Sequence, residues 1–248
     1  MNLESVYEEN QIQFGNLFGA TWSLYKTHFI SIFVLTFIGI LPSLYAFYID
    51  PAILAEPTVA SFLFNAVIGG SLALISYMSI MNIVDDSVAG RYTGIIMAVR
   101  KAVSRLPLAV TTGLLTLIML LGWFLLLIIP CMIKSVRYSF TIQAVAIRKV
   151  AHLEAVRYSV KMVDDYWWTV VIAGFLIGLP GFILSIGAPF ILSTLNTSVN
   201  IQSVFLGVVV VNILTTSFWY VGETLLFLAL EGIKTNSAII TTPSSIKA

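Results

Sequence analysis

Long apolar stretches are the feature that most constrains this chain. A helix needs about 20 predominantly apolar residues to cross the hydrocarbon core of a bilayer. Only 10% of the 248 residues are charged, against about 25% in soluble domains. The sequence therefore predicts an all-α, polytopic membrane protein with a single integral membrane domain over residues 1–248. Five stretches are long and apolar enough to span: 29–49, 59–84, 108–129, 168–192 and 203–230.

A sixth, weaker stretch covers residues 132–150, and the charges of the loops assign it to the membrane. Counted in chain order, residues 132–150 are the fourth of six spans. Basic residues then gather between the second and third spans and between the fourth and fifth, whereas the loops after the first and fifth spans have none. Cytoplasmic loops carry the excess of Lys and Arg. This alternation predicts six spans with both termini in the cytoplasm.

Three amphipathic segments precede pairs of spans, at residues 14–29, 93–106 and 151–165. Each places apolar residues on one helical face and charged or polar residues on the other, which is typical of helices that lie in the membrane interface. An interfacial helix followed by two spans, three times over, predicts a threefold hairpin repeat. The alternative is that any six helices joined by short loops resemble three hairpins.

Few residues in this chain are suited to catalysis or metal binding. His28 and His152 lie far apart and lack metal-ligand spacing, and Cys131 is the only cysteine, so no internal disulfide is expected. The charge is too sparse for a nucleic-acid surface. We therefore expect no metal, no cofactor, no nucleic-acid partner and no enzymatic activity.

The polar and charged residues of the stretch 132–150 form a stripe along one face of the predicted helix. At 100° per residue, Lys134, Arg137, Thr141 and Arg148 fall within an arc of about 60°. Two mid-membrane cations cost about 5–7 kcal/mol, whereas the apolar residues of the stretch return only about 2–4 kcal/mol. The stripe is therefore expected to lie inside the helix bundle or beside water.

Glu223 in the last apolar stretch is the expected counter-charge of Arg137. It shares a helical face with Asn212 and Thr216, and an ionisable residue inside a membrane is a functional hypothesis by default. Three roles are open: a structural ion pair, a pocket for a polar substrate or lipid headgroup, and a proton path. The predicted binding residues are Lys134, Arg137, Thr141, Arg148, Asn212, Thr216 and Glu223.

The segment "EAVRYSVKMVDDYWWTVV", which begins at Glu154, resembles a signature of a bacterial inner-membrane family. This is the poorly characterised six-helix family related to the membrane domain of glycerophosphoryl diester phosphodiesterases. "LLIIPCMIKSVRYSFTIQAVAI" and "FGNLFGATWSLYKTHF" are similar to its Arg-bearing helix and its first interfacial helix. In the fused phosphodiesterases a separate soluble domain does the chemistry, and no such domain is expected here. The matching positions are Glu154, Ala155, Arg157, Ser159, Trp167 and Trp168.

Two functions are consistent with this sequence. The first is a non-enzymatic module of the bacterial inner membrane that binds membrane lipids, a protein partner or a second copy of itself. The alternative is a transporter or permease-like subunit that exports, or confers immunity to, an amphipathic molecule by means of the polar stripe. An ATP-driven version would need a separate ATPase, because the chain has no nucleotide-binding motif.

Overall fold

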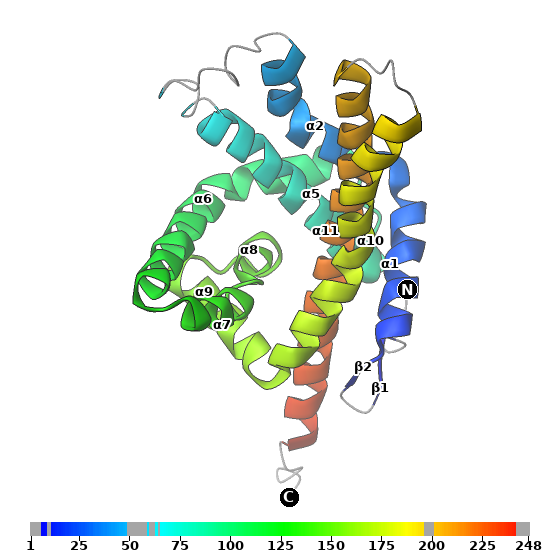
Figure 1. Cartoon of the computed structure of the whole chain (residues 1–248). Coiled ribbons are helices and arrows are strands. Elements are labelled where there is room, and N and C mark those ends of the chain that lie inside the picture. Colours follow the sequence, from blue (N-terminus) through cyan, green and yellow to red (C-terminus); the bar gives the residue numbers. More distant parts are fainter. Residues whose placement is uncertain are drawn as a thin grey trace, which may run out of the picture.

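The computed structural model describes residues 6–8, 11–48, 59, 63, 65–195 and 201–241. The loop expected at 50–56 and residues 196–200 of the loop expected after the fifth span lie outside these ranges. The described part is helical apart from two short antiparallel strands, β1 (Tyr7–Glu8) and β2 (Gln11–Ile12). The α-helices are α1 (Phe14–Thr27), α2 (Phe29–Tyr48), α5 (Gly70–Val88), α6 (Ile95–Leu126), α7 (Ile128–Arg137), α8 (Thr141–Gln143), α9 (His152–Val163), α10 (Trp167–Leu195) and α11 (Ile201–Thr241) (Figure 1).

Four helical stretches are long and apolar enough to cross a membrane. The bent pair of α1 and α2 would make a fifth if it is counted as one span, and its two helices meet at 85°. The described residues of the five apolar stretches predicted as spans are helical apart from Leu127, and the chain has the features of a multi-pass helical membrane protein. The count of six spans and the cytoplasmic placement of the termini stay predictions. The four stretches are Ala66–Val88, Ile95–Leu126, His152–Gly187 and Leu206–Thr235.

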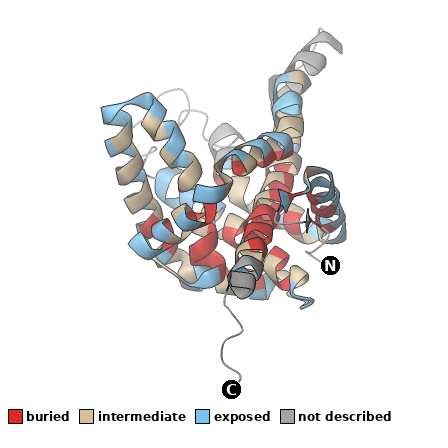
Figure 2. Cartoon of the chain, turned by 90° about the horizontal axis from the view of Figure 1, so that it is seen from below, coloured by how far each residue is buried: buried red, intermediate tan, exposed pale blue. Residues whose placement is uncertain are grey.

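The long helix α11 forms the centre of the fold. It packs against α10, α5, α1 and α2, and Leu225 through Leu230 are each at most 4% exposed. Figure 2 shows buried residues along this central helix and on the sides of the helices around it. By contrast, α6 is mostly exposed, since only 11% of its most apolar window is buried. In a bilayer, such an apolar and exposed helix faces lipid.

Small residues let α10 and α11 approach closely. A Cβ at Gly222 would lie 2.6 Å from Cγ2 of Ile177, and a Cβ at Gly178 would lie 2.5 Å from the indole of Trp219. Neither position has room for a larger side chain unless its neighbour moves. Close approach at small residues is a common way for membrane helices to gain packing energy.

The interfacial segments are only partly confirmed as separate helices. The first, α1, is a distinct helix set at a sharp angle to α2. The second prediction is wrong, because residues 95–106 continue without a break into the third span as α6. Pro107 lies inside that helix. The third, α9, leads through a short 3-10 turn at Asp164–Tyr166 into α10. The threefold repeat stays a prediction.

The expectation of one continuous helix over 132–150 is wrong, whereas the crossing of the membrane by this stretch stays a prediction. Helix α7 ends at Arg137, a turn follows at residues 138–140, and a π-helical segment, Ala144–Arg148, follows α8. The buried Ser159 of α9 stabilises this turn. Its hydroxyl donates to the carbonyl of Arg137 at 2.7 Å and accepts from the N–H of Phe140 at 3.0 Å. Backbone groups released by the break are thus satisfied by a neighbouring helix, as burial in a membrane requires.

Candidate functional site

Glu223 of α11 is part of a buried hydrogen-bonded cluster that joins three helices. The hydroxyl of Tyr77 on α5 donates to Oε2 of Glu223 at 2.7 Å. The same hydroxyl accepts from Nε2 of Gln143 on α8 at 2.8 Å. The rings of Tyr77 and Tyr220 pack against each other with centroids 4.4 Å apart. We call Tyr77, Gln143 and Glu223 the Glu223 cluster.

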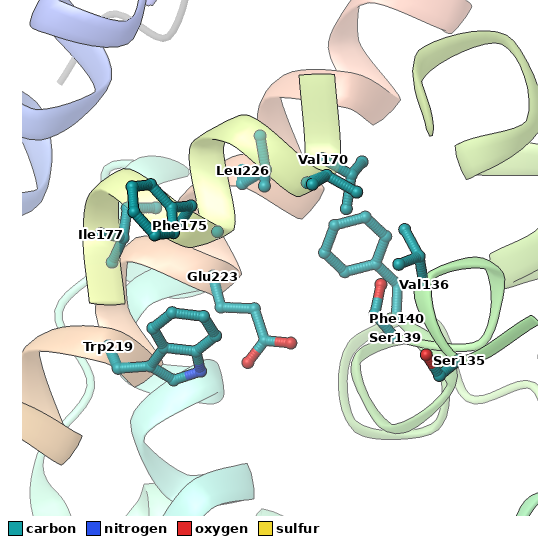
Figure 3. Close-up of a pocket in the computed structure, with 12 residues that line it drawn as sticks. Ser135, Val136, Ser139, Phe140, Val170, Phe175, Ile177, Trp219, Glu223 and Leu226 are labelled. Atoms are coloured by element: carbon teal, nitrogen blue, oxygen red, sulfur yellow. The ribbon is translucent and has the colours of Figure 1, made fainter. Parts of the chain in front are cut away.

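The Glu223 carboxylate faces a cavity of about 340 Å³, called here the Glu223 cavity. Figure 3 shows the carboxylate projecting between Trp219 on one side and Phe140 and Ser139 on the other. The cavity lies between the end of α7, the turn before α8, α10 and α11. Glu223 is the only ionisable residue among those that line it. The lining residues are Ser135, Val136, Ser139, Phe140, Val170, Val171, Gly174, Phe175, Ile177, Trp219, Glu223 and Leu226.

One polar atom of the cavity wall lacks a hydrogen-bond partner in the described structure. The hydroxyl of Ser139 is buried and makes no hydrogen bond with any described residue. Buried polar atoms are normally paired, and an exception calls for an explanation. Ser139 lies in the turn between α7 and α8, so the helix break is what brings this hydroxyl to the cavity.

Glu223 lies near mid-depth of its span. At 1.5 Å per residue it is about 18 Å from the Thr235 end of the stretch Leu206–Thr235 and about 26 Å from the Leu206 end. None of the ion pairs among the described residues includes Glu223. The side chains that hydrogen-bond to it, Tyr77, Gln143 and Trp219, are all neutral. Placing an ionisable carboxyl group at this depth costs free energy, and residues of this kind usually have a functional role.

The expected pair of Arg137 and Glu223 is wrong. Arg137 instead pairs with Asp164, whose Oδ1 lies 2.9 Å from its Nε, although the angle falls short of hydrogen-bond geometry. The helix ends at Arg137, so the predicted stripe has no continuous axis beyond it. Arg137 therefore points toward the turn after α9 rather than toward α11, and both partners stay partly exposed, at 33% and 44%.

Arg148, predicted as part of the polar stripe, contacts an acidic residue of α11 other than Glu223. Its guanidinium binds Glu231 of α11 through two nitrogens, with Nε at 2.7 Å from Oε1, and Tyr158 donates to the same carboxylate. Burial opposes the charge of Arg148, but the Glu231 carboxylate outweighs burial and raises the pKa of Arg148. This arrangement fastens the π-helical segment to α11, at the end of the helix that the loop charges assign to the cytoplasm.

The remaining predicted binding residues do not line the Glu223 cavity. The ammonium of Lys134 lies 5.0 Å from the centre of the Trp123 ring. The hydroxyl of Thr141 donates to the carbonyl of Tyr138 at 2.8 Å, and the amide of Asn212 donates to Val208 at 3.1 Å within α11. Thr216 is half-buried on the same helix. Of the seven predicted site residues, only Glu223 reaches the cavity.

Sequence reasoning missed Tyr77, Gln143, Ser139 and Trp219 as functional candidates. The sequence did indicate Trp219 as a neighbour of Glu223, because it precedes Glu223 by one helical turn and so shares its helical face. Gln143 also had one, as an amide within an otherwise apolar run. Tyr77 and Ser139 had none, since hydroxyls are common in membrane helices. Among the described residues, no group of three or more His, Cys, Asp or Glu side chains is placed to hold a metal ion.

Comparison with known proteins adds no assignment. No protein-family model matches the chain, and neither a curated protein nor a solved structure matches it. The resemblance to the six-helix bacterial family therefore stays a prediction. The helices show a multi-pass membrane architecture, and the Glu223 cavity is the feature from which a function is best argued.

Proposed function

We propose that this chain is a non-enzymatic protein of the bacterial inner membrane that binds an amphipathic, lipid-like molecule in the Glu223 cavity. The observation that carries the proposal is the position of the Glu223 carboxylate in the wall of an otherwise largely apolar cavity. An apolar wall with a few convergent polar groups is the usual form of a small-molecule site. The volume, about 340 Å³, falls in the range of such sites.

The walls of the cavity match the two ends of such a ligand. Val136, Val170 and Leu226 offer apolar contacts, whereas Ser139 and Glu223 offer hydrogen bonds. Phe175 lines the cavity and is 65% exposed, so the apolar part of the wall extends to the outer surface of α10. On a helix that crosses a membrane, that surface faces lipid. A ligand from the bilayer would thus reach the site sideways.

A cavity-filling variant tests this proposal. The protein is purified in a mild detergent, and bound lipids are counted by native mass spectrometry. Val171→Phe places a ring into the cavity wall, and Val110→Phe on the exposed face of α6 is the matched control. We expect Val171→Phe to lose the bound amphiphile and Val110→Phe to retain it, with unchanged helical circular dichroism in both. Equal retention by both variants would contradict the proposal.

Transport is the second candidate function, and the break between α7 and α8 favours it. Discontinuous helices beside a polar site at membrane depth are a recurring feature of secondary transporters, and Ser135 and Ser139 of the broken segment line the Glu223 cavity. Flux of an amphiphile into proteoliposomes, abolished by Val171→Phe, would support transport over binding alone. An ATP-driven version requires a separate ATPase as partner.

A further inference from the structure

We infer that the ligand of the Glu223 cavity is a cation, an amphipathic alkylammonium with its charged group beside Glu223 and its chain along the apolar wall. The inference rests on the proposed function and names the chemical class of the ligand. It is argued from the charge of the cavity, from its aromatic residues and from the unpaired hydroxyl of Ser139.

Charge complementarity is the first argument. Within the described residues, the ion pairs use Asp85, Asp86, Asp164, Asp165 and Glu231 as their acids. Glu223 is the remaining acid that lies deep in a span, and no Lys or Arg lines its cavity. Charged residues inside membranes normally pair with one another or face a functional site. A cationic ligand would supply the missing counter-charge, whereas an anionic one would be repelled.

The aromatic residues of the cavity are the second argument. Trp219, Phe140 and Phe175 all line it, and Figure 3 shows Trp219 and Phe140 on either side of the Glu223 carboxylate. The face of an aromatic ring attracts a cation, and Trp does so most strongly. Aromatic rings combined with a carboxylate form a typical site for ammonium groups. A neutral alcohol would gain little from the same rings.

Ser139 completes the polar end. Its hydroxyl is buried without a partner among the described residues and lies in the same wall as Glu223. A hydroxyl oxygen accepts hydrogen bonds, so it can receive an N–H of a primary or secondary ammonium. The apolar chain would then run past Val170 toward Phe175, which is partly exposed on α10.

Binding of short-chain probes in a neutral detergent tests the charge of the ligand. Octylammonium, octanol and octyl sulfate have the same chain and differ in charge, and isothermal titration calorimetry measures the binding of each. Titration of the Val171→Phe variant measures the heat that arises when a probe enters the micelle, and this heat is subtracted as the blank. We expect the wild-type protein to bind the cation roughly tenfold more tightly than octanol, because a cation–π contact and a charge partner are together worth about 1–2 kcal/mol.

Substitutions at Glu223 separate charge from shape. Glu223→Gln should reduce the preference for the cation to less than roughly twofold, whereas Glu154→Gln, an equal charge change on the exposed face of α9, should leave it unchanged. If Glu223→Gln does not fold, Trp219→Leu keeps the carboxylate, removes the ring and should still lower the preference for octylammonium over octanol.

Two results would overturn the inference, and they differ in what else they overturn. If octanol binds as tightly as the cation, the site holds a neutral ligand or Glu223 is protonated. The inference of a cationic ligand is then wrong, whereas the proposal that the cavity binds an amphiphile stands. If no probe binds above the Val171→Phe blank and no native amphiphile is retained, the proposed function fails as well.

Discussion

Tyr77 donates its hydroxyl hydrogen to Glu223 at 2.7 Å across 146 residues of sequence. This bond joins α5 to α11, and the bond from Gln143 to Tyr77 adds α8. A carboxyl group inside the helix bundle is thereby oriented by a neutral donor rather than by a cation. The arrangement fixes the carboxyl group in place, and none of the ion pairs among the described residues includes it.

Tyr77→Phe should lower the free energy of unfolding by about 1–2 kcal/mol, because it removes a donor from Glu223 and an acceptor from Gln143. Unfolding of the protein in mixed micelles, followed by circular dichroism, measures the change. The double variant Tyr77→Phe with Glu223→Gln should cost less than the sum of the two single changes, because the two residues share one bond. Strict additivity would show that the bond contributes nothing to stability.

Ser159→Ala should destabilise the protein by about 1–3 kcal/mol, since two buried backbone groups lose their partner at the break between α7 and α8. Ser104→Ala is the matched control, because the hydroxyl of Ser104 is exposed on α6 and donates only within its own helix. We expect the control to change stability by less than about 0.5 kcal/mol. Equal effects in a thermal melt would mean that Ser159 does not support the turn.

Gly222→Ala should cost about 1–3 kcal/mol through overpacking against Ile177. Combining it with Ile177→Ala should remove the clash, so that the double variant is more stable than the sum of the two single effects predicts. Gly122→Ala has open space around its Cβ and should be neutral or stabilising by up to about 1 kcal/mol. An unfolding titration of the four variants tests the close approach of α10 and α11.

Arg148→Lys should lower stability by about 1 kcal/mol although it keeps the charge, because an ammonium does not reproduce the two-nitrogen contact with Glu231. The cost is at the lower end for a charged hydrogen bond, since the Arg148 side chain is 36% exposed and water screens it. Arg157→Lys on the exposed face of α9 should have no measurable effect. A melt in which both substitutions behave alike would argue against a specific bond.

The helical class and the five apolar stretches could be predicted because hydropathy is a local property of the chain. Each stretch carries its own signal, and α2, α5, α10 and α11 lie close to where that signal placed them, whereas α6 begins well before its apolar stretch. The partner of Arg137 could not be predicted in the same way. The three residues between α7 and α8 leave the helical phase, so spacing alone no longer says which face Thr141 or Arg148 occupies.

Only part of the Glu223 cavity could be predicted from the sequence. The sequence marked Glu223 as an ionisable residue in a span, and that position lines the cavity. Its neighbours Tyr77 and Gln143 come from segments 146 and 80 residues away. Which helices become neighbours depends on small residues such as Gly222 and on the turn held by Ser159, and neither effect has a signature in hydropathy.

Helix α11 makes two distant contacts mechanically dependent on each other. Its 41 residues form one helix of about 61 Å, and Glu223 and Glu231 lie about 12 Å apart along it. A helix without a break transmits rotation or sliding along its whole length. Any shift of α11 that repositions the Glu223 carboxylate therefore also moves Glu231, and with it the contact that holds Arg148.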